Sequence, residues 1–534
     1  MLQLVASAQT TVYWTGSQDD KWENAGNWVG GTPSINTHVV IGERAISNQP
    51  KIVVDNQGNG KQTECLSLTI GGAYEATLTI ESEKWLHIET NLNIRSNGTF
   101  RNRRTKVLIK GDWKNDGAYI EEAVGQGNKW TYIPSVEFIG TSQKITGSSE
   151  SRINHLEIKS YVTLESNLSV ALPGYNYGNL IVHNGAVIDP ADKKVTWTSV
   201  GGFFDLKNGA TAKVKALNYL DNYSIRPTGP YDSKGNPGAE HTSIIDYAGT
   251  IEYQNIDDKI IYQRLVVSGS GVKSLLGNTT VSAGAPDTEV DVREATLDLK
   301  TYTLTRQAAG GSLKVAAGAT LKVGGLRNGP DLNFANRLFD ANSTVDYYGA
   351  NQTVQHNTYG HLMLSNTGVK TMPATPMTIA GNLTSTGTAQ YTAAGALTVG
   401  ENVIVGEGTS FNGGPLVHTV SGNWVNSGTF TPGGSTIIFN GTRNTTITGV
   451  TTFNSLTINK TAGANTVTLH SNVTATTLNM TSGEMRTGAN RMIILGNRTG
   501  DGWVVGTVNR QHAFSAGVAY AFNGPYATIA FSGG

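Results

Sequence analysis

The stretch that decides the fold runs from residue 66 to residue 94, where four short segments follow one another closely. They read Leu66-Ser67-Leu68-Thr69-Ile70, Leu78-Thr79-Ile80, Leu86-His87-Ile88 and Leu92-Asn93-Ile94. Apolar and polar residues alternate within each segment, which is the period of a β-strand with one buried face. Gly, Asn, Ser and Glu residues separate the segments and suit turns. The stretch therefore predicts short strands in close succession.

Composition extends this prediction to the whole chain and excludes several classes of protein. The 534 residues include 64 glycines, and the 40 basic residues are balanced by 40 acidic ones. A neutral chain has no electrostatic footprint for nucleic acid or for an anionic membrane. No apolar run approaches the roughly 18 residues of a membrane-spanning helix. Cys65 is the only cysteine, which excludes an intrachain disulfide and a cysteine-based metal site.

A longer unit recurs four times along the chain. Its first copy reads Val136-Glu137-Phe138-Ile139-Gly140, Gln143-Lys144-Ile145 and Ile153-Asn154-His155-Leu156-Glu157-Ile158, and later copies begin near residues 251, 345 and 437. We align the copies on an anchoring aromatic residue, at Phe138, Tyr253, Tyr347 and Phe439. A second motif also repeats, because residues 111–119 (GDWKNDGAY) match residues 422–430 (GNWVNSGTF). The chain is therefore predicted to be an array of repeats of about 90–115 residues.

Two architectures accommodate repeats of this length. Tandem immunoglobulin-like β-sandwiches have about 100 residues each. A β-solenoid instead coils each repeat into several turns of roughly 20–30 residues. The short apolar runs between glycines favour the solenoid, with inward Leu, Ile and Val and with Asn, Thr and Gly at the corners. We predict an all-β, right-handed parallel β-helix, with tandem sandwiches as the alternative.

The sequence divides into four predicted segments. Residues 1–8 end in Ala-Ser-Ala before Gln9, which is typical of the end of a secretory signal peptide. Residues 9–135 are predicted to form an N-terminal cap and the first turns, and residues 136–495 the repetitive solenoid. Residues 496–534 are predicted to begin a C-terminal β-sandwich-like module that is truncated.

Residues that carry catalytic chemistry elsewhere do not form a recognisable site here. The acidic pairs Asp19-Asp20, Glu121-Glu122 and Asp257-Asp258 are adjacent in sequence, so strand geometry directs their side chains to opposite faces. The ten histidines lack metal-site spacing, and His155 and His361 occupy equivalent repeat positions that tolerate other polar residues. Residues 55–60 (DNQGNG) resemble a calcium loop without its bidentate acid. We predict no catalytic, cofactor-binding or metal-ligating residue.

Two further groups have structural interpretations. Trp14, Trp22 and Trp28 form either an aromatic sugar-binding face or a cap over the end of the solenoid core, and we favour the cap. Arg101, Arg103, Arg104 and Lys106 form the only basic cluster, which a solvated loop or strand edge explains.

Several of these motifs resemble those of secreted cell-surface proteins of Bacteroidota. The resemblance rests on Tyr13-Trp14-Thr15-Gly16, Trp22, Asn27-Trp28, Gly30-Gly31-Thr32-Pro33, Val39-Val40-Ile41 and the repeat unit. The segment 502–510 (GWVVGTVNR) with Tyr520-Ala521-Phe522 is similar to the start of a module in those proteins. Many of them are large, adhesin-like substrates of the type IX secretion system. No C-terminal sorting domain of that system is visible here.

The resemblance implies an extracellular, cell-surface protein that passes through secretion machinery during export. We expect a non-catalytic structural or adhesive stalk segment, without a cofactor, that contacts an extracellular polysaccharide or another cell-surface component. One alternative is a β-helix polysaccharide lyase or glycoside hydrolase, which a cluster of Asp, Glu, Arg and Lys on one face would favour. Another is a glycan-binding module, which an exposed row of Trp and Tyr would favour.

Overall fold

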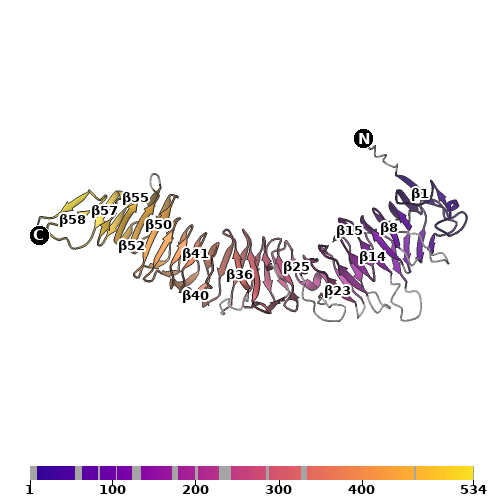
Figure 1. Cartoon of the computed structure of the whole chain (residues 1–534), viewed down its shortest axis with the longest axis horizontal. Helices are drawn as coiled ribbons and strands as arrows, with labels where there is room; N and C mark the ends of the chain where they lie inside the picture. Colours follow the sequence, from indigo (N-terminus) through magenta and orange to yellow (C-terminus); the bar gives the residue numbers. More distant parts are fainter. Residues whose placement is uncertain are drawn as a thin grey trace. The chain divides into compact units, whose positions relative to one another are not determined.

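The chain folds as a parallel β-solenoid of about 18 turns, as a computed structural model shows (Figure 1). The structure describes residues 9–53, 63–81, 85–103, 105–122, 134–170, 178–198, 202–227, 242–283, 288–325, 334–461 and 465–532. The predicted fold class is confirmed, and tandem sandwiches are not formed. The predicted signal segment, residues 1–8, lies outside the described residues.

The chain divides into two compact units, which we call the N-terminal and C-terminal units. The N-terminal unit comprises residues 1–266 and 284–286, and the C-terminal unit comprises residues 267–283 and 287–534. This division falls within the predicted repetitive region, residues 136–495.

The N-terminal unit places three strands in most turns, and equivalent strands of successive turns pair in parallel (Figure 1). The first sheet comprises, in spatial order, β2 (Trp28–Val29), β1 (Thr10–Trp14), β3 (Thr37–Ile41), β6 (Ser67–Ile70), β9 (Leu92–Ile94), β12 (Trp113–Asn115), β15 (Ser142–Thr146), β18 (Tyr161–Leu164), β21 (Val187–Asp189), β24 (Thr211–Val214), β25 (Ile244–Tyr247) and β28 (Arg264–Val267). The second face carries β4 (Lys51–Val53), β7 (Ala76–Glu81), β10 (Gly98–Asn102) and β13 (Ala118–Glu121), then β16 (Ser151–Arg152), β19 (Leu168–Val170) and β22 (Val195–Trp197). The third sheet comprises β5 (Thr63–Cys65), β8 (Trp85–Ile88), β11 (Lys106–Ile109), β14 (Ser135–Phe138), β17 (Leu156–Ile158), β20 (Asn179–Val182) and β23 (Phe203–Leu206). The unit also contains β26 (Tyr253–Ile256), β27 (Ile261–Tyr262), the short helix α1 (Tyr219–Asn222) and the 3-10 turn η1 (Ala25–Asn27).

The C-terminal unit continues the same construction with longer ladders. Its main sheet contains β29 (Val272–Leu275), β32 (Thr296–Asp298), β35 (Thr320–Val323), β37 (Thr344–Tyr347), β39 (His361–Leu364), β41 (Met377–Ile379), β42 (Leu383–Ser385), β44 (Leu397–Val399), β45 (Val403–Val405), β47 (Val417–Val420), β48 (Trp424–Asn426), β50 (Thr436–Gly441), β51 (Thr445–Thr448), β52 (Thr451–Lys460), β53 (Thr466–Leu469), β54 (Val473–Ser482), β55 (Glu484–Ile494), β56 (Arg498–Thr499) and β57 (Trp503–Arg510). Other faces carry β31 (Thr288–Val292), β34 (Gly310–Val315) and β36 (Phe334–Phe339), β30 (Thr279–Val281) and β33 (Leu304–Arg306), and β38 (Gln352–Thr353), β40 (Thr367–Thr371), β43 (Thr388–Thr392), β46 (Ser410–Asn412) and β49 (Thr429–Thr431).

Period-two alternation explains why these segments become strands of a solenoid. In β7 the residues Ala76, Leu78 and Ile80 are buried, and the residues between them face outward. Leu68 pairs in register with Leu92, and Leu92 pairs with Trp113 of the following turn, so inward apolar side chains stack from turn to turn. This stacking places each strand's apolar face on the shared core.

The turns have the length that the sequence predicts. Leu383 pairs with Val403, and Val403 pairs with Trp424, so these turns take 20 and 21 residues. Corner asparagines fix this spacing: Asn382 Oδ1 accepts from Asn402 N–H (3.0 Å), Asn402 Oδ1 from Asn423 N–H (2.8 Å), and Asn423 Oδ1 from Thr446 N–H (2.8 Å). The predicted role of asparagine at the corners is therefore confirmed at these positions.

The tryptophans near the N-terminus cap the core. Trp14, Trp22 and Trp28 are all buried, and Trp28 packs edge-to-face on both others with ring centroids 4.9 Å apart. β2 pairs antiparallel with β1, which closes that end of the first sheet. The buried rings favour the predicted cap, and these three side chains do not form an exposed sugar-binding face.

The repeat unit is organised around a buried glutamine. Gln143 Nε2 donates to Ile109 O (3.0 Å) and Gly111 O (2.6 Å) of the preceding turn. Gln254 Nε2 donates in the same way to Val214 O and Ala216 O. Gln352 Nε2 donates to Val323 O and Gly325 O. A buried carbonyl needs such a partner. The glutamine is therefore the conserved element of the repeated structure in these three copies.

The prediction that Tyr253 anchors the second copy is wrong, and Tyr247 is the anchoring aromatic of that copy. Tyr253 is 59% exposed, whereas Tyr247 is fully buried and occupies the position of Phe138 and Tyr347. Gln254 follows Tyr247 by seven residues, but Gln143 follows Phe138 by five. The two extra residues lie in the corner between Tyr247 and Gln254. They put the second copy out of alignment with the other copies.

The second repeated motif is a packing unit. Trp113 and Trp424 are fully buried, and each packs edge-to-face on the aromatic residue six positions later. The ring centroids are 4.9 Å apart for Tyr119 and 4.8 Å apart for Phe430.

The parallel ladder continues beyond the predicted end of the solenoid at residue 495. β57 pairs in parallel with β55, from Trp503 opposite Glu484 to Arg510 opposite Ile494. Only β58 (Ala519–Ala521) and β59 (Thr528–Ala530) form an antiparallel pair in residues 496–532. Among the described residues, no helix is long and apolar enough to cross a membrane.

Candidate functional site

A group of six charged or titratable side chains lies on the outward positions of the third sheet of the N-terminal unit. Glu137 of β14 and Glu157 of β17 are direct partners in the parallel ladder. Lysines and histidines from the same and neighbouring strands surround these two carboxylates. We call this group the Glu137–Glu157 cluster, and its other members are Lys106, His155, Lys159 and His183.

Every carboxylate oxygen of the cluster has a cationic or imidazole partner. Lys106 Nζ contacts Glu137 Oε1, and Lys159 Nζ lies 2.8 Å from Glu137 Oε2. His183 Nε2 lies 2.7 Å from Glu157 Oε2, and His155 Nε2 lies 3.4 Å from Glu157 Oε1. Parallel register brings Lys106, Glu137, Glu157 and His183 together, although each of these four is 20 or more residues from the next in sequence. Sequence analysis treated His155 as a tolerant position and did not identify the cluster.

The pairing holds two members of the cluster, Glu157 and Lys159, in their charged forms. The hydrogen bond from His155, assisted by His183, lowers the pKa of Glu157 to about 2. Burial lowers the pKa of Lys159, but the hydrogen bond and charge of Glu137 outweigh burial and raise it. A general acid or base works best when its pKa lies near the working pH. The cluster is therefore a set of ion pairs between neighbouring strands of the parallel ladder.

A second polar group lies on the outer face of the first sheet. The Tyr161 hydroxyl donates to Asp189 Oδ2 (2.7 Å), and Lys213 Nζ donates to the same hydroxyl (3.0 Å). Lys215 Nζ lies 2.9 Å from Asp189 Oδ2. Burial alone raises the pKa of Asp189, but the bonds from Tyr161 and Lys215 outweigh it and lower that pKa. This carboxylate is also held ionised.

The acidic pairs behave as strand geometry predicts. Glu121 is buried and accepts from Tyr119 Oη and Asn154 N–H, each at 2.9 Å, whereas Glu122 pairs outside with Arg101 and Arg103. Burial raises the pKa of Glu121 to about 8. Burial likewise lowers the pKa values of Lys370 and Lys460 to about 8. These three groups have pKa values near neutrality, but all are enclosed.

The remaining acidic pairs and the basic cluster are also engaged. Asp20 forms an ion pair with Lys51, and Asp258 forms one with Lys259. The Asp257 carboxylate accepts hydrogen bonds from Nε and Nη2 of Arg226. Arg103 also reaches Glu81, so the basic cluster is neutralised by carboxylates of neighbouring turns. Arg104 and the calcium-like loop at residues 55–60 lie outside the described residues. No group of three or more potential metal ligands occurs in the described part of the chain.

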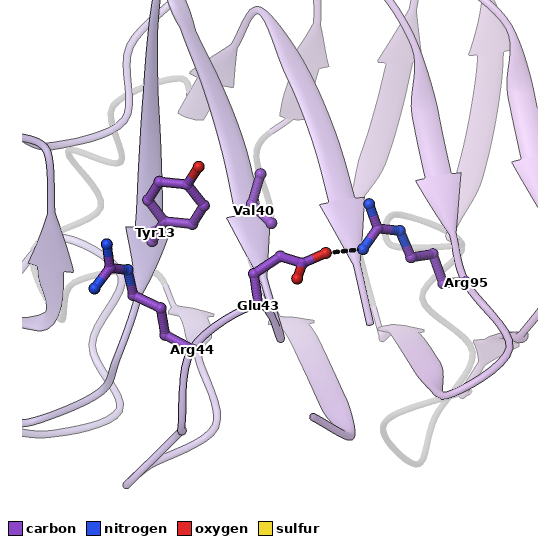
Figure 2. Close-up of a pocket in the computed structure, with 5 residues that line it drawn as sticks. All are labelled: Tyr13, Val40, Glu43, Arg44 and Arg95. Carbon is purple, nitrogen blue, oxygen red and sulfur yellow. Dashed lines mark hydrogen bonds and ion pairs between the residues drawn. The ribbon is translucent and has the colours of Figure 1, made fainter. Parts of the chain in front are cut away.

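A shallow depression opens on the first sheet close to the N-terminal cap (Figure 2). Its lining residues are Tyr13, Val40, Glu43, Arg44 and Arg95. Tyr13 and Val40 are ladder partners in β1 and β3, and both are outward positions. The Arg44 guanidinium carbon lies 4.9 Å from the centre of the Tyr13 ring. Adjacent strand residues face opposite sides, so Tyr13 faces outward while Trp14 caps the core, but sequence analysis did not single out Tyr13 as a site residue.

Comparison with known proteins gives one match. Residues 13–121 match a family described as a domain of unknown function (DUF8693). All five lining residues of the depression fall within the matched stretch. No curated protein and no solved structure matches the chain.

Proposed function

We propose that the chain is a structural and adhesive segment of a secreted cell-surface protein, and that it is not an enzyme. Continuous parallel ladders and a stacked apolar core run through each unit, and this construction resists stretching. The resemblance of its motifs to adhesin-like surface proteins of Bacteroidota supports the same proposal. Its partner is an extracellular polysaccharide, contacted along the outward polar rows.

One observation carries the non-catalytic part of the proposal. The outward carboxylate Glu157 is held ionised by its partners, and so is Asp189, whose side chain is only 3% exposed. The groups with pKa values near neutrality, Glu121, Lys370 and Lys460, are buried and out of reach of a polymer. Hydrolysis of a glycosidic bond needs an accessible carboxyl group whose pKa is raised.

The test is incubation of the purified chain with plant, algal and bacterial polysaccharides. We expect retention on at least one polysaccharide and no new reducing or unsaturated ends. Cleavage of any polysaccharide would overturn the non-catalytic proposal, and failure to bind the whole panel would overturn the adhesive one.

The second candidate is a polysaccharide lyase or glycoside hydrolase, and the Glu137–Glu157 cluster is the observation that favours it. Two ladder-paired carboxylates with two lysines and two histidines combine acids and bases on one face. If cleavage is found, the Glu157→Gln variant abolishes it, because Glu157 is the more accessible of the two carboxylates.

A further inference from the structure

We infer that the depression on the first sheet is a subsite for an acidic sugar, in which the apolar surface of Tyr13 and Val40 carries the sugar ring and Arg44, held against one face of the Tyr13 ring, binds its anionic group. This inference rests on the proposed polysaccharide-binding function and names where and what the chain binds. The depression has a volume of about 490 Å³, within the range of roughly 300–1,000 Å³ that is usual for small-ligand pockets.

The side chains of the depression combine an apolar surface with an excess of positive charge. Tyr13 and Val40 lie side by side on neighbouring strands and provide the apolar part (Figure 2). Arg95 pairs with Glu43, and its guanidinium also reaches Gly71 O at 3.4 Å. Arg44 adds a second positive charge, so the lining residues carry two cations and one anion.

Arg44 differs from the other arginines of this face in its contacts. It is exposed, and no ion pair or hydrogen bond engages it among the residues that the structure describes. Its guanidinium instead lies over the Tyr13 ring. Stacking on an aromatic ring restrains the guanidinium while leaving its N–H groups available. An arginine in this state can bind a carboxylate or a sulfate through two parallel hydrogen bonds.

The outer row next to the depression suits an extended sugar chain. Val40 pairs with Thr69, and Thr69 pairs with Asn93, so short polar side chains follow the apolar pair on successive strands. A pyranose packs its C–H face on an aromatic ring and directs its hydroxyls to polar neighbours. The combination selects a carbohydrate that carries an anionic group over a free anion.

The test measures binding of three oligosaccharides of similar length by isothermal titration calorimetry. The probes are tetragalacturonate, a sulfated carrageenan tetrasaccharide and neutral cellotetraose. We expect the acidic probes to bind at least tenfold more tightly than cellotetraose, and their affinity to fall as salt is raised. Preference between carboxylate and sulfate identifies which anion the subsite takes.

Variants assign the binding to the depression. Arg44→Gln is expected to weaken binding of the acidic probe about tenfold or more, and Arg44→Lys to weaken it less, because charge remains but the paired hydrogen bonds are lost. Tyr13→Ala removes the ring surface and is expected to weaken binding similarly. The control is Arg152→Gln, which removes another exposed positive charge of the same unit, one that is paired with Glu150 and lies far along the sequence. Circular dichroism confirms that each variant is folded.

Two results separate failure of this inference from failure of the proposed function. The subsite is overturned if Arg44→Gln leaves the binding of acidic probes unchanged, or if only neutral sugars bind. Either result still supports the proposal that the chain binds polysaccharide. Absence of binding to every probe and every polysaccharide overturns both.

Discussion

At the scale of single residues, polar side chains hold together a core that is otherwise apolar. The buried glutamines Gln143, Gln254 and Gln352 each satisfy two carbonyl groups at a corner, where the strand ladder is interrupted. Lys370 extends this arrangement, because its Nζ donates to Gln352 Oε1 at 3.0 Å. An apolar residue at these corners would leave buried carbonyls without partners.

Glu121 makes the stability of the chain depend on pH. Burial raises its pKa to about 8 from an ordinary value of 4.5. Between these values the folded chain holds a proton that the unfolded chain has released, so the free energy of unfolding falls as pH rises from 4.5 to 8. Glu121→Gln keeps the shape and removes the ionisation.

Urea unfolding at pH 5 and at pH 7.5 checks this prediction. The difference between the two midpoints is expected to be smaller in Glu121→Gln than in the natural chain. Equal differences in the two proteins would show that Glu121 does not titrate in this range.

At the scale of strands and corners, glycine sets how closely successive turns approach. A Cβ atom at Gly428 would lie 2.3 Å from Gly406 O and 2.6 Å from Thr409 O. Gly117 occupies the equivalent position of the repeated motif, and a Cβ atom there would lie 2.2 and 2.3 Å from two carbonyl oxygens. These are backbone atoms that cannot move without disturbing the ladder.

Gly428→Ala is therefore expected to destabilise the C-terminal unit by about 1–3 kcal/mol, the usual cost of overpacking a tight site. The matched control is Gly434→Ala, where the nearest atoms lie at an ordinary 3.5 Å. That variant is expected to stay within about 0.5 kcal/mol of the natural chain. Thermal unfolding of both variants gives the comparison, and equal destabilisation would contradict the close-approach argument.

Sequence patterns predicted the elements better than the site. Alternation in segments such as Leu78-Thr79-Ile80 and the repeated Trp113 and Trp424 motifs depend on neighbours close in sequence, and those predictions held. The Glu137–Glu157 cluster and the Tyr13 depression depend on which residues parallel register brings together. The length of each corner sets that register. Where corner length varies, as in the corner before Gln254, the register cannot be predicted from the sequence.

At the scale of the whole molecule, each turn contacts chiefly the turns before and after it. Stability in such an array is the sum of local contributions and interfaces between neighbours.

Hydrogen–deuterium exchange of Gly428→Ala is expected to show this locality. Amides of the neighbouring turns, residues 397–448, should exchange faster than in the natural chain, and amides of residues 9–198 should be unchanged. Faster exchange throughout both units would show that the chain unfolds as one cooperative body.

The regular spacing of the turns around Leu383, Val403 and Trp424 has a consequence for how such a gene changes. Because each turn presents the same donors, acceptors and apolar stripe to the next, a duplicated or deleted stretch of one turn's length leaves a matching junction. Gain or loss of whole turns therefore changes the number of turns in the C-terminal unit while the remaining turns keep their sequence, so unequal recombination can change that number without altering the residues of the core.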